Sequence, residues 1–144
     1  MPGSRRNPQY ARTSLECELP PQGIGYIHLP RLGGLRRPRP ESPNQGWRNL
    51  SFRGYADYML EDAFWEEIES LIRLAGRQPT AIMCAEAVPW RCHRSLVADA
   101  LTVRGVEVLH LGAGSRPRPH TLTPFAEVRE GRLLYPGPPA AGRP

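Results

Sequence analysis

The chain contains no lysine: all 19 of its basic side chains are arginine, and against 14 acidic ones they give a net charge of +5. With 17 prolines and 14 glycines, this composition indicates the codon usage of a GC-rich genome. Residues 1–54 carry nine arginines and three glutamates. Because arginine binds phosphates and carboxylates in bidentate pairs, an anionic partner for this half is one interpretation, and a solvated basic surface is the other.

Long apolar runs and an even set of cysteines are also absent. No run approaches the ~20 apolar residues of a membrane-spanning helix, so we expect no membrane partner. The charged opening residues lack the apolar stretch of a signal peptide behind them. Three cysteines at irregular spacing do not form a disulfide framework, which predicts a reducing, cytoplasmic location. The length predicts a single domain over 1–136 and a disordered proline-rich tail over 137–144.

Residues 81–101 combine clear structural signals with the most reactive side chains. The apolar run 81–83 predicts a short buried strand, and apolar residues at helical spacing over 96–101 predict a helix that Gly105 ends. The run 106–111 predicts a second strand, so the segment forms a βαβ unit with a right-handed crossover. Ligands collect at the carboxyl ends of parallel strands, beside helix N-termini, and we expect the functional site there.

Local patterns predict further elements before this unit. A capping box of Thr13 and Glu16 predicts a helix over 13–19, and alternating apolar residues predict a strand over 24–29. Prolines and glycines exclude regular structure from most of the loop 30–50. We expect Trp47 and Phe52 to attach the end of this loop to the core.

Two more elements complete the prediction. Helical spacing of apolar residues from about 54 to 75 predicts one long amphipathic helix that ends at Gly76. Glu130-Gly131 predicts the turn of a terminal hairpin. The elements together predict an α/β fold with a short, mostly parallel sheet and flanking helices.

Five reactive side chains follow the strand predicted at 81–83 or open the next helix: Cys84, Glu86, Cys92, His93 and Arg94. A thiol at a strand end, facing a helix N-terminus and arginines, should have a lowered pKa, which favours Cys84 as a nucleophile. However, enzymes that hold a phosphate between a cysteine and an arginine separate the two by five residues, whereas six separate Cys84 from Arg91. Glu86 would also repel a phosphate. A small buried cysteine that ends a core strand is the alternative.

Metal and redox chemistry are further alternatives for the same thiols. Cys84, Cys92 and His93 could supply three metal ligands. A fourth could come from His28, His110 or Cys17. The chain has no Cys-x-x-Cys motif, and side chains of adjacent residues rarely both reach one ion. The separation of Cys84 from Cys92 also differs from that of the usual redox pair. We therefore expect no metal and no cofactor.

His93 and Arg94 are better candidates, because an arginine and free backbone N–H groups in the first turn of a helix can hold an anion together. Glu86 could compensate their charge at the site, or it could pair with one of them and only tie the loop to the helix. Ser4 and Arg5 could reach the same edge of the sheet. We expect His28 and His110 to be packed rather than catalytic.

Several motifs resemble those of the domain-of-unknown-function 488 family. They are the basic loop over 2–8, Leu32-Gly33-Gly34, Gly46-Trp47-Arg48-Asn49 with Phe52-Arg53-Gly54-Tyr55-Ala56-Asp57-Tyr58-Met59, Met83-Cys84-Ala85-Glu86 with Pro89 and Cys92-His93-Arg94, and His120 with Leu122-Thr123-Pro124-Phe125. The resemblance implies a mostly bacterial, cytosolic protein with a Rossmann-like, three-layer α/β fold and no settled activity. Family members usually begin with a strand, a helix and a further strand before the basic loop. The resemblance therefore implies an N-terminally truncated member or a translation start upstream of Met1.

The functional hypothesis is an enzyme that acts on a phosphate-bearing or nucleotide-like substrate. Glu86 or His93 would be the acid or base, and Cys84 would be a nucleophile or a packing residue. The substrate-binding residues would be Arg94, Arg5, Ser4 and Cys92. One alternative is a non-catalytic module that binds nucleotides or nucleic acid through Arg5, Arg6, Arg36, Arg37 and Arg39. The other is an inactive, shortened member of the family.

Overall fold

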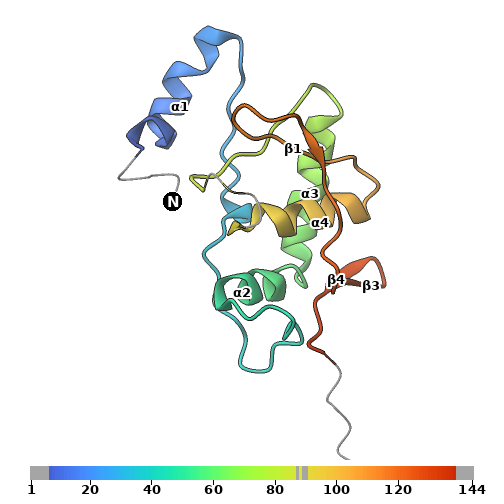
Figure 1. Ribbon diagram of the computed structural model, residues 1–144. Coiled ribbons are helices and arrows are strands. Elements are labelled where there is room, and N and C mark those ends of the chain that lie inside the picture. The colour runs from blue at the N-terminus through green and yellow to red at the C-terminus, as the bar shows by residue number, and fades with distance from the viewer. Residues whose placement is uncertain (1–6, 87, 89–90, 139–144) are drawn as a thin grey trace, which may run out of the picture.

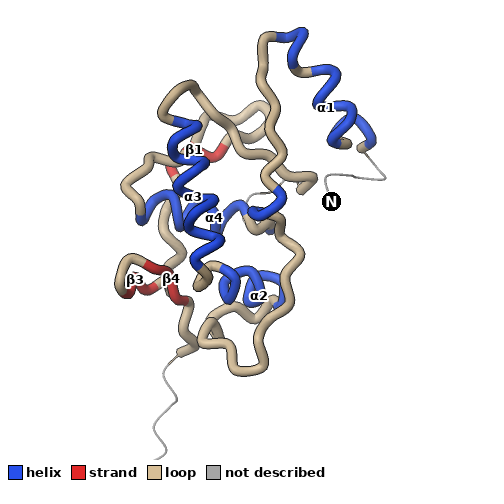
Figure 2. Tube along the Cα trace, turned by 180° about the vertical axis from the view of Figure 1, so that it is seen from behind, coloured by secondary structure: helices blue, strands red, loops and turns tan. Residues whose placement is uncertain are grey.

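The computed structural model describes residues 7–86, 88 and 91–138 (Figure 1). The described part contains four α-helices: α1 (Arg12–Glu18), α2 (Leu50–Tyr58), α3 (Asp62–Ala75) and α4 (Arg94–Val103). Its strands are β1 (Leu109–His110), β2 (Arg118–Pro119), β3 (Glu127–Arg129) and β4 (Arg132–Leu134). Three short 3-10 helices begin at prolines: Pro8–Tyr10, Pro20–Gln22 and Pro30–Leu32. Helices and loops dominate the chain, as Figure 2 shows from behind.

The helix predicted over 54–75 is two helices, α2 and α3. Asn49 caps α2, because its side chain accepts hydrogen bonds from two backbone N–H groups of the first turn. The chain leaves the helical path after Tyr58, and side chains from elsewhere bind the carbonyl groups freed at the break. The Trp65 indole donates to the Met59 carbonyl at 2.7 Å, and the Arg132 guanidinium donates to the Leu60 carbonyl. The Arg132 contact comes from 72 positions away, which is why helical periodicity alone did not indicate the break.

The helix α4 confirms the helix predicted after the reactive segment. Its buried face includes Leu96, Val97, Ala100 and Leu101. Gly105 follows the C-cap with a φ of +77°, a left-handed conformation that glycine adopts without strain. The Val106 N–H then bonds the Leu101 carbonyl at 3.0 Å, and the Gly105 N–H bonds that of Thr102. This is a Schellman ending, and it directs the chain back along the helix toward β1.

The core lies between α2, α3 and α4, and the C-terminal segment closes it. Fully buried side chains from all four come together here, including Tyr55, Phe64, Leu96, Leu133 and Tyr135. Arg104 links α3 to α4, with its Nε 2.9 Å from the Glu69 carboxylate. As expected, Trp47 and Phe52 pack against this core, with ring centroids 5.0 Å apart.

A buried polar network fixes the loop that precedes α2. The Asp57 carboxylate on α2 accepts hydrogen bonds from the Ser42 hydroxyl at 2.5 Å, the Asn44 amide at 2.8 Å and the Arg39 backbone N–H at 2.8 Å. Asn44 is fully buried, and its carbonyl oxygen also accepts from the Tyr135 N–H at 2.9 Å. The loop is therefore tied to both α2 and the C-terminal segment.

The predicted Rossmann-like, mostly parallel sheet is wrong. In the described part the strands form two separate antiparallel pairs, β1 with β2 and β3 with β4. The segments 24–29 and 81–83 form no strand, and β1 covers only two residues of the predicted 106–111. Ile27 and Leu111, from two of these segments, are 58% and 63% exposed. Apolar alternation does not specify a hydrogen-bonding partner, and the core that a sheet would cover is instead filled by helices.

Two elements near the ends of the chain, the β3–β4 hairpin and the helix α1, lie at or near their predicted positions. The hairpin of β3 and β4 is confirmed, with Glu130 and Gly131 at φ of 50° and 74°, as a type I′ turn requires. The helix α1 lies near its predicted place, but the capping box is wrong because no side chain caps it. Arg12 instead pairs with Glu16 at 2.6 Å. The predicted tail lies outside the described residues from 139 onward. None of the helices in the described part has the length and apolarity that crossing a bilayer needs.

Candidate functional site

The predicted thiol site is assembled where the chain enters α4. Cys92 is buried just before the helix, and its sulfur accepts hydrogen bonds from the Arg94 backbone N–H at 3.5 Å and the Arg94 Nε at 3.4 Å. Cys84 and His93 lie beside it, so that one ligand atom from each of the three lies within 4.8 Å of the others. The Cys92 sulfur is 3.5 Å from His93 Nδ1. The adjacent side chains of Cys92 and His93 therefore do approach one point, an arrangement that the sequence analysis treated as rare.

The two thiols differ in their pKa values because they share one hydrogen bond. The pKa of Cys92 is lowered to about 6, chiefly because the Cys84 thiol donates to it and also because the backbone and guanidinium of Arg94 stabilise a thiolate. The same bond, together with burial, raises the pKa of Cys84. Cys92, rather than the predicted Cys84, is therefore the group with thiolate character.

The His93 ring is half-buried and packs against the Tyr55 ring and Gly34. Its centroid lies 5.1 Å from that of the Tyr55 ring, and burial lowers the pKa of His93. Gly34 lies directly against the imidazole: a Cβ at position 34 would be 2.4 Å from Nδ1. Only a residue without a side chain fits there, so this glycine is required by the packing of His93.

Glu86 and Arg94 are brought together, but not as the predicted ion pair. The Arg94 guanidinium donates to the backbone carbonyl of Glu86, and the Glu86 side chain is exposed. Arg94 therefore holds the 84–86 segment against Cys92. The two remaining substrate-binding candidates, Ser4 and Arg5, lie outside the described residues.

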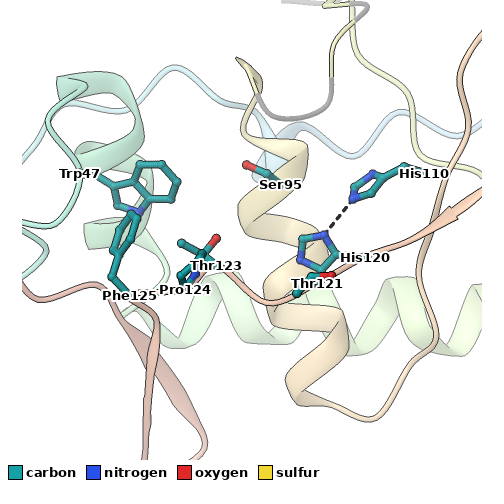
Figure 3. Close-up of a pocket in the computed structure, with 8 residues that line it drawn as sticks. All are labelled: Trp47, Ser95, His110, His120, Thr121, Thr123, Pro124 and Phe125. Atoms are coloured by element: carbon teal, nitrogen blue, oxygen red, sulfur yellow. Dashed lines mark hydrogen bonds between the residues drawn. The ribbon is translucent and has the colours of Figure 1, made fainter.

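A second cluster, which we name the Asp99 relay, consists of Asp99, His120 and His110. Asp99 is completely buried on α4 and binds His120 Nε2 through Oδ1 at 2.7 Å. His120 Nδ1 lies 2.8 Å from His110 Nε2 (Figure 3). Asp99 also accepts from the Thr123 N–H at 3.0 Å and the Tyr135 hydroxyl at 2.8 Å. The antiparallel pairing of β1 with β2 brings the two histidines together, since His110 ends β1 and His120 follows β2.

The hydrogen bonds dictate how protons are arranged along the relay. Three donors converge on Asp99, so His120 presents its Nε2–H to the carboxylate. His120 Nδ1 is then an acceptor, and His110 must donate to it from Nε2. This leaves Nδ1 of His110 with a free lone pair. The pKa of His110 is lowered, first by burial and then by its electrostatic interactions with His120 and Arg94, which favours the neutral ring.

The relay opens into a pocket of about 400 Å³. In Figure 3 the two histidines lie at one end of the pocket, and Trp47 and Phe125 form an aromatic wall at the other. The lining residues are Trp47, Ser95, His110, His120, Thr121, Thr123, Pro124 and Phe125. Ser95 donates to the Cys92 carbonyl at 3.0 Å, so the pocket begins one helical turn from the thiol cluster.

The sequence interpretation missed Asp99, His120 and Tyr135 as a functional group and treated His110 as packing. One signal was present: Asp99 lies three residues after Leu96, on the apolar face of the predicted helix. An acid on a buried helix face requires hydrogen-bonding partners. The sequence contains no local indication of which residues these are, because they lie 21 to 36 positions away.

Comparison with known proteins adds one finding. The family model described as "Domain of unknown function DUF488" matches residues 1–101. The chain belongs to the DUF488 family. The matched region of this DUF488 protein contains the thiol cluster and Asp99, whereas His110, His120 and Tyr135 follow it. No curated protein and no solved structure matches the chain.

Proposed function

We propose that this DUF488 protein is an enzyme that uses His110 as a general base on a phosphate-bearing or nucleotide-like small molecule. The observation that carries the proposal is the Asp99 relay, which is buried at Asp99 and reaches the pocket at His110. His110 Nδ1 would accept a proton from a water molecule as its oxygen attacks the phosphorus atom. The imidazolium would then return that proton to the leaving oxygen as its bond to phosphorus breaks.

The relay supports this role because it fixes which nitrogen of His110 accepts the proton. The hydrogen bonds from His110 to His120 at 2.8 Å and from His120 to Asp99 at 2.7 Å leave Nδ1 of His110 as the free acceptor, and the lowered pKa of His110 favours release of the proton to the leaving oxygen. The three hydrogen bonds to Asp99 hold its carboxylate in one orientation. The base is thus fixed in both position and tautomer before substrate binds.

The pocket walls support the substrate class. The rings of Trp47 and Phe125 offer a surface for a planar base, and the hydroxyl groups of Ser95, Thr121 and Thr123 offer polar contacts. The charge of Arg94 acts on His110, so it also favours an anion at that end of the pocket. Two nitrogens of Arg94, its Nε and one terminal nitrogen, already bind Cys92 and Glu86. The proposed role of Arg94 in substrate binding is therefore the electrostatic attraction of an anion rather than a direct hydrogen bond.

The proposal moves the acid–base role from Glu86 and His93 to His110. The half-buried His93 packs against Tyr55 and Gly34, and it belongs with Cys84 and Cys92 in the thiol cluster. We also infer a reducing cytoplasmic compartment, which agrees with the three free thiols.

The alternative of a nucleic-acid-binding module receives less support. Arg36 stacks on the Tyr58 ring with its Cζ 3.7 Å from the centroid, and it donates to the Arg31 and Gly33 carbonyls. Arg39 pairs with Glu61 at 3.1 Å. These guanidinium groups are engaged within the chain. No observation in the described part favours this alternative over the enzyme.

The test is phosphate release from p-nitrophenyl phosphate and from adenosine mono-, di- and triphosphate. We expect His110→Asn to lower turnover by about 10²-fold or more, because it removes the base but keeps a side chain that can bond His120. His28→Asn is the matched control, since His28 lies outside the relay and the pocket. Equal turnover in His110→Asn and the unaltered chain, or no release from any of the four compounds, would contradict the proposal.

A further inference from the structure

We propose that Cys84, Cys92 and His93 form a Zn²⁺ site with one coordination position left for an exogenous ligand. The inference rests on the thiol cluster alone and does not depend on the function proposed for the pocket. Two thiolates and an imidazole are ligands that zinc prefers, and together they neutralise its charge.

The separation of the ligand atoms matches tetrahedral zinc. Bonds of about 2.3 Å to sulfur and about 2.0–2.1 Å to nitrogen, at tetrahedral angles, place sulfur and nitrogen about 3.5 Å apart. The Cys92 sulfur lies 3.5 Å from His93 Nδ1. The Cys84 sulfur lies within 4.8 Å of both. A small inward rotation of the Cys84 side chain would complete the triangle.

The surroundings of the cluster are those of a supported metal site. The backbone N–H and the Nε of Arg94 both donate to the Cys92 sulfur, which stabilises it as a thiolate ligand. The His93 ring is held by a hydrogen bond with the Leu32 backbone. Gly34 leaves room for this ring, because a Cβ at position 34 would overlap it. Two of the three ligands, Cys92 and His93, are therefore oriented by contacts with neighbouring residues.

The fourth position has no candidate side chain. Among the described residues, only these three of the His, Cys, Asp and Glu side chains gather at the cluster. Residues 1–6, 87, 89–90 and 139–144 contain none of these four residue types. Zinc with three protein ligands binds water or a substrate atom at the fourth position, as in catalytic rather than structural zinc sites.

The test is metal analysis of the full chain, reduced with a phosphine and dialysed against Zn²⁺ and then against metal-free buffer. We expect one retained zinc per chain, and at least about tenfold weaker affinity in Cys84→Ser and Cys92→Ser. Cys17→Ser is the matched control, because Cys17 is an exposed cysteine on α1, and it should retain the full zinc content. Gly34→Ala should weaken binding through displacement of His93 alone.

A second measurement uses the unaltered chain and so does not depend on how the variants fold. Zinc should protect Cys84 and Cys92 from alkylation and leave Cys17 reactive, as mass spectrometry of the labelled peptides would report. Equal alkylation of all three cysteines with and without zinc would overturn the proposal. So would a chain that retains no zinc and forms a Cys84–Cys92 disulfide in air, because it would show a redox pair instead.

Discussion

Replacement of Asp99 by asparagine tests how strongly the relay is held together. The Asp99 side chain is completely buried and accepts three hydrogen bonds, from His120, Thr123 and Tyr135. In Asp99→Asn the amide oxygen must stay at the Oδ1 position, where two donors converge. The new NH₂ group then faces the Tyr135 hydroxyl, which has to become an acceptor.

The expected loss follows from this rearrangement. Hydrogen bonds to a charged group contribute about 1.5–3 kcal/mol each, and neutral ones about 0.5–1.5 kcal/mol. Three bonds weakened by about 1 kcal/mol each give a loss of about 3 kcal/mol in the free energy of unfolding. A domain of this size should then melt about 9 °C lower. Tyr135→Phe removes only one of the three donors and should cost about 1 kcal/mol.

Urea unfolding followed by circular dichroism measures both variants. Glu107→Gln is the matched control, because it neutralises an exposed acid, and it should change stability by less than about 0.5 kcal/mol. A loss below about 1 kcal/mol in Asp99→Asn would refute the reasoning, since it would mean that the three hydrogen bonds do not require a charge.

Three other predictions concern the loop, the helix packing and the pH response. Asn44→Ala removes the amide that joins Asp57 to the Tyr135 N–H and should cost about 2–3 kcal/mol in chemical unfolding; a loss under 1 kcal/mol would contradict that bridge. Gly54→Ala should destabilise the fold by at least about 2 kcal/mol, because its Cβ would lie 2.5 Å from the Arg36 carbonyl oxygen. The control is Gly76→Ala, whose Cβ meets nothing closer than 3.5 Å and which should be neutral or stabilising. Equal melting temperatures of the two variants would contradict this packing. The pKa of His110 in the folded chain lies below its usual value of 6.5, so the unfolded chain binds this proton more readily than the folded chain does. The stability that comes from the neutral ring is therefore present above pH 6.5 and is lost as the pH falls through the lower folded pKa. An NMR titration of His110 with a midpoint at or above 6.5 would contradict this prediction.

Elements with local signals were predictable from the sequence. The apolar stripe lies within α4 and Gly105 directly follows its C-cap, and Glu130-Gly131 alone specifies the β3–β4 turn. The break between α2 and α3 was not predictable in this way. It depends on Arg132, which is 72 positions from the Leu60 carbonyl it binds.

Strand pairing was the largest error, for a related reason. An apolar run such as 81–83 favours burial in the sequence pattern, but it does not specify which backbone will bond it, and Met83 is 48% exposed in the structure. His110 illustrates the same limit, because β1 takes its partner from residues 118–119 rather than from 81–83. The sequence therefore supported an α/β prediction that the structure contradicts.

The candidate site was predictable in part. The reactive residues around Cys84 and Cys92 do meet, because they lie within nine positions of each other and are ordered by the start of α4. The Asp99 relay draws on three distant segments, and only the unexplained acid on the apolar face of α4 pointed to it. Contacts between residues that are close in the sequence can be predicted from their spacing, whereas contacts between residues on distant loops can be identified only once the fold is known.

The central claim is that Asp99 orients two histidines so that His110 Nδ1 carries a free lone pair at the pocket. Long-range ¹⁵N–¹H NMR of the imidazole groups tests this directly, with His110→Asn and His120→Asn to assign the signals. We expect both rings as Nε2–H tautomers, and loss of this preference at both in Asp99→Ala, which removes the oxygen that accepts the His120 Nε2–H. A proton on Nδ1 of His110 in the unaltered chain would contradict the claim, and so would tautomers that are unchanged when Asp99 is replaced.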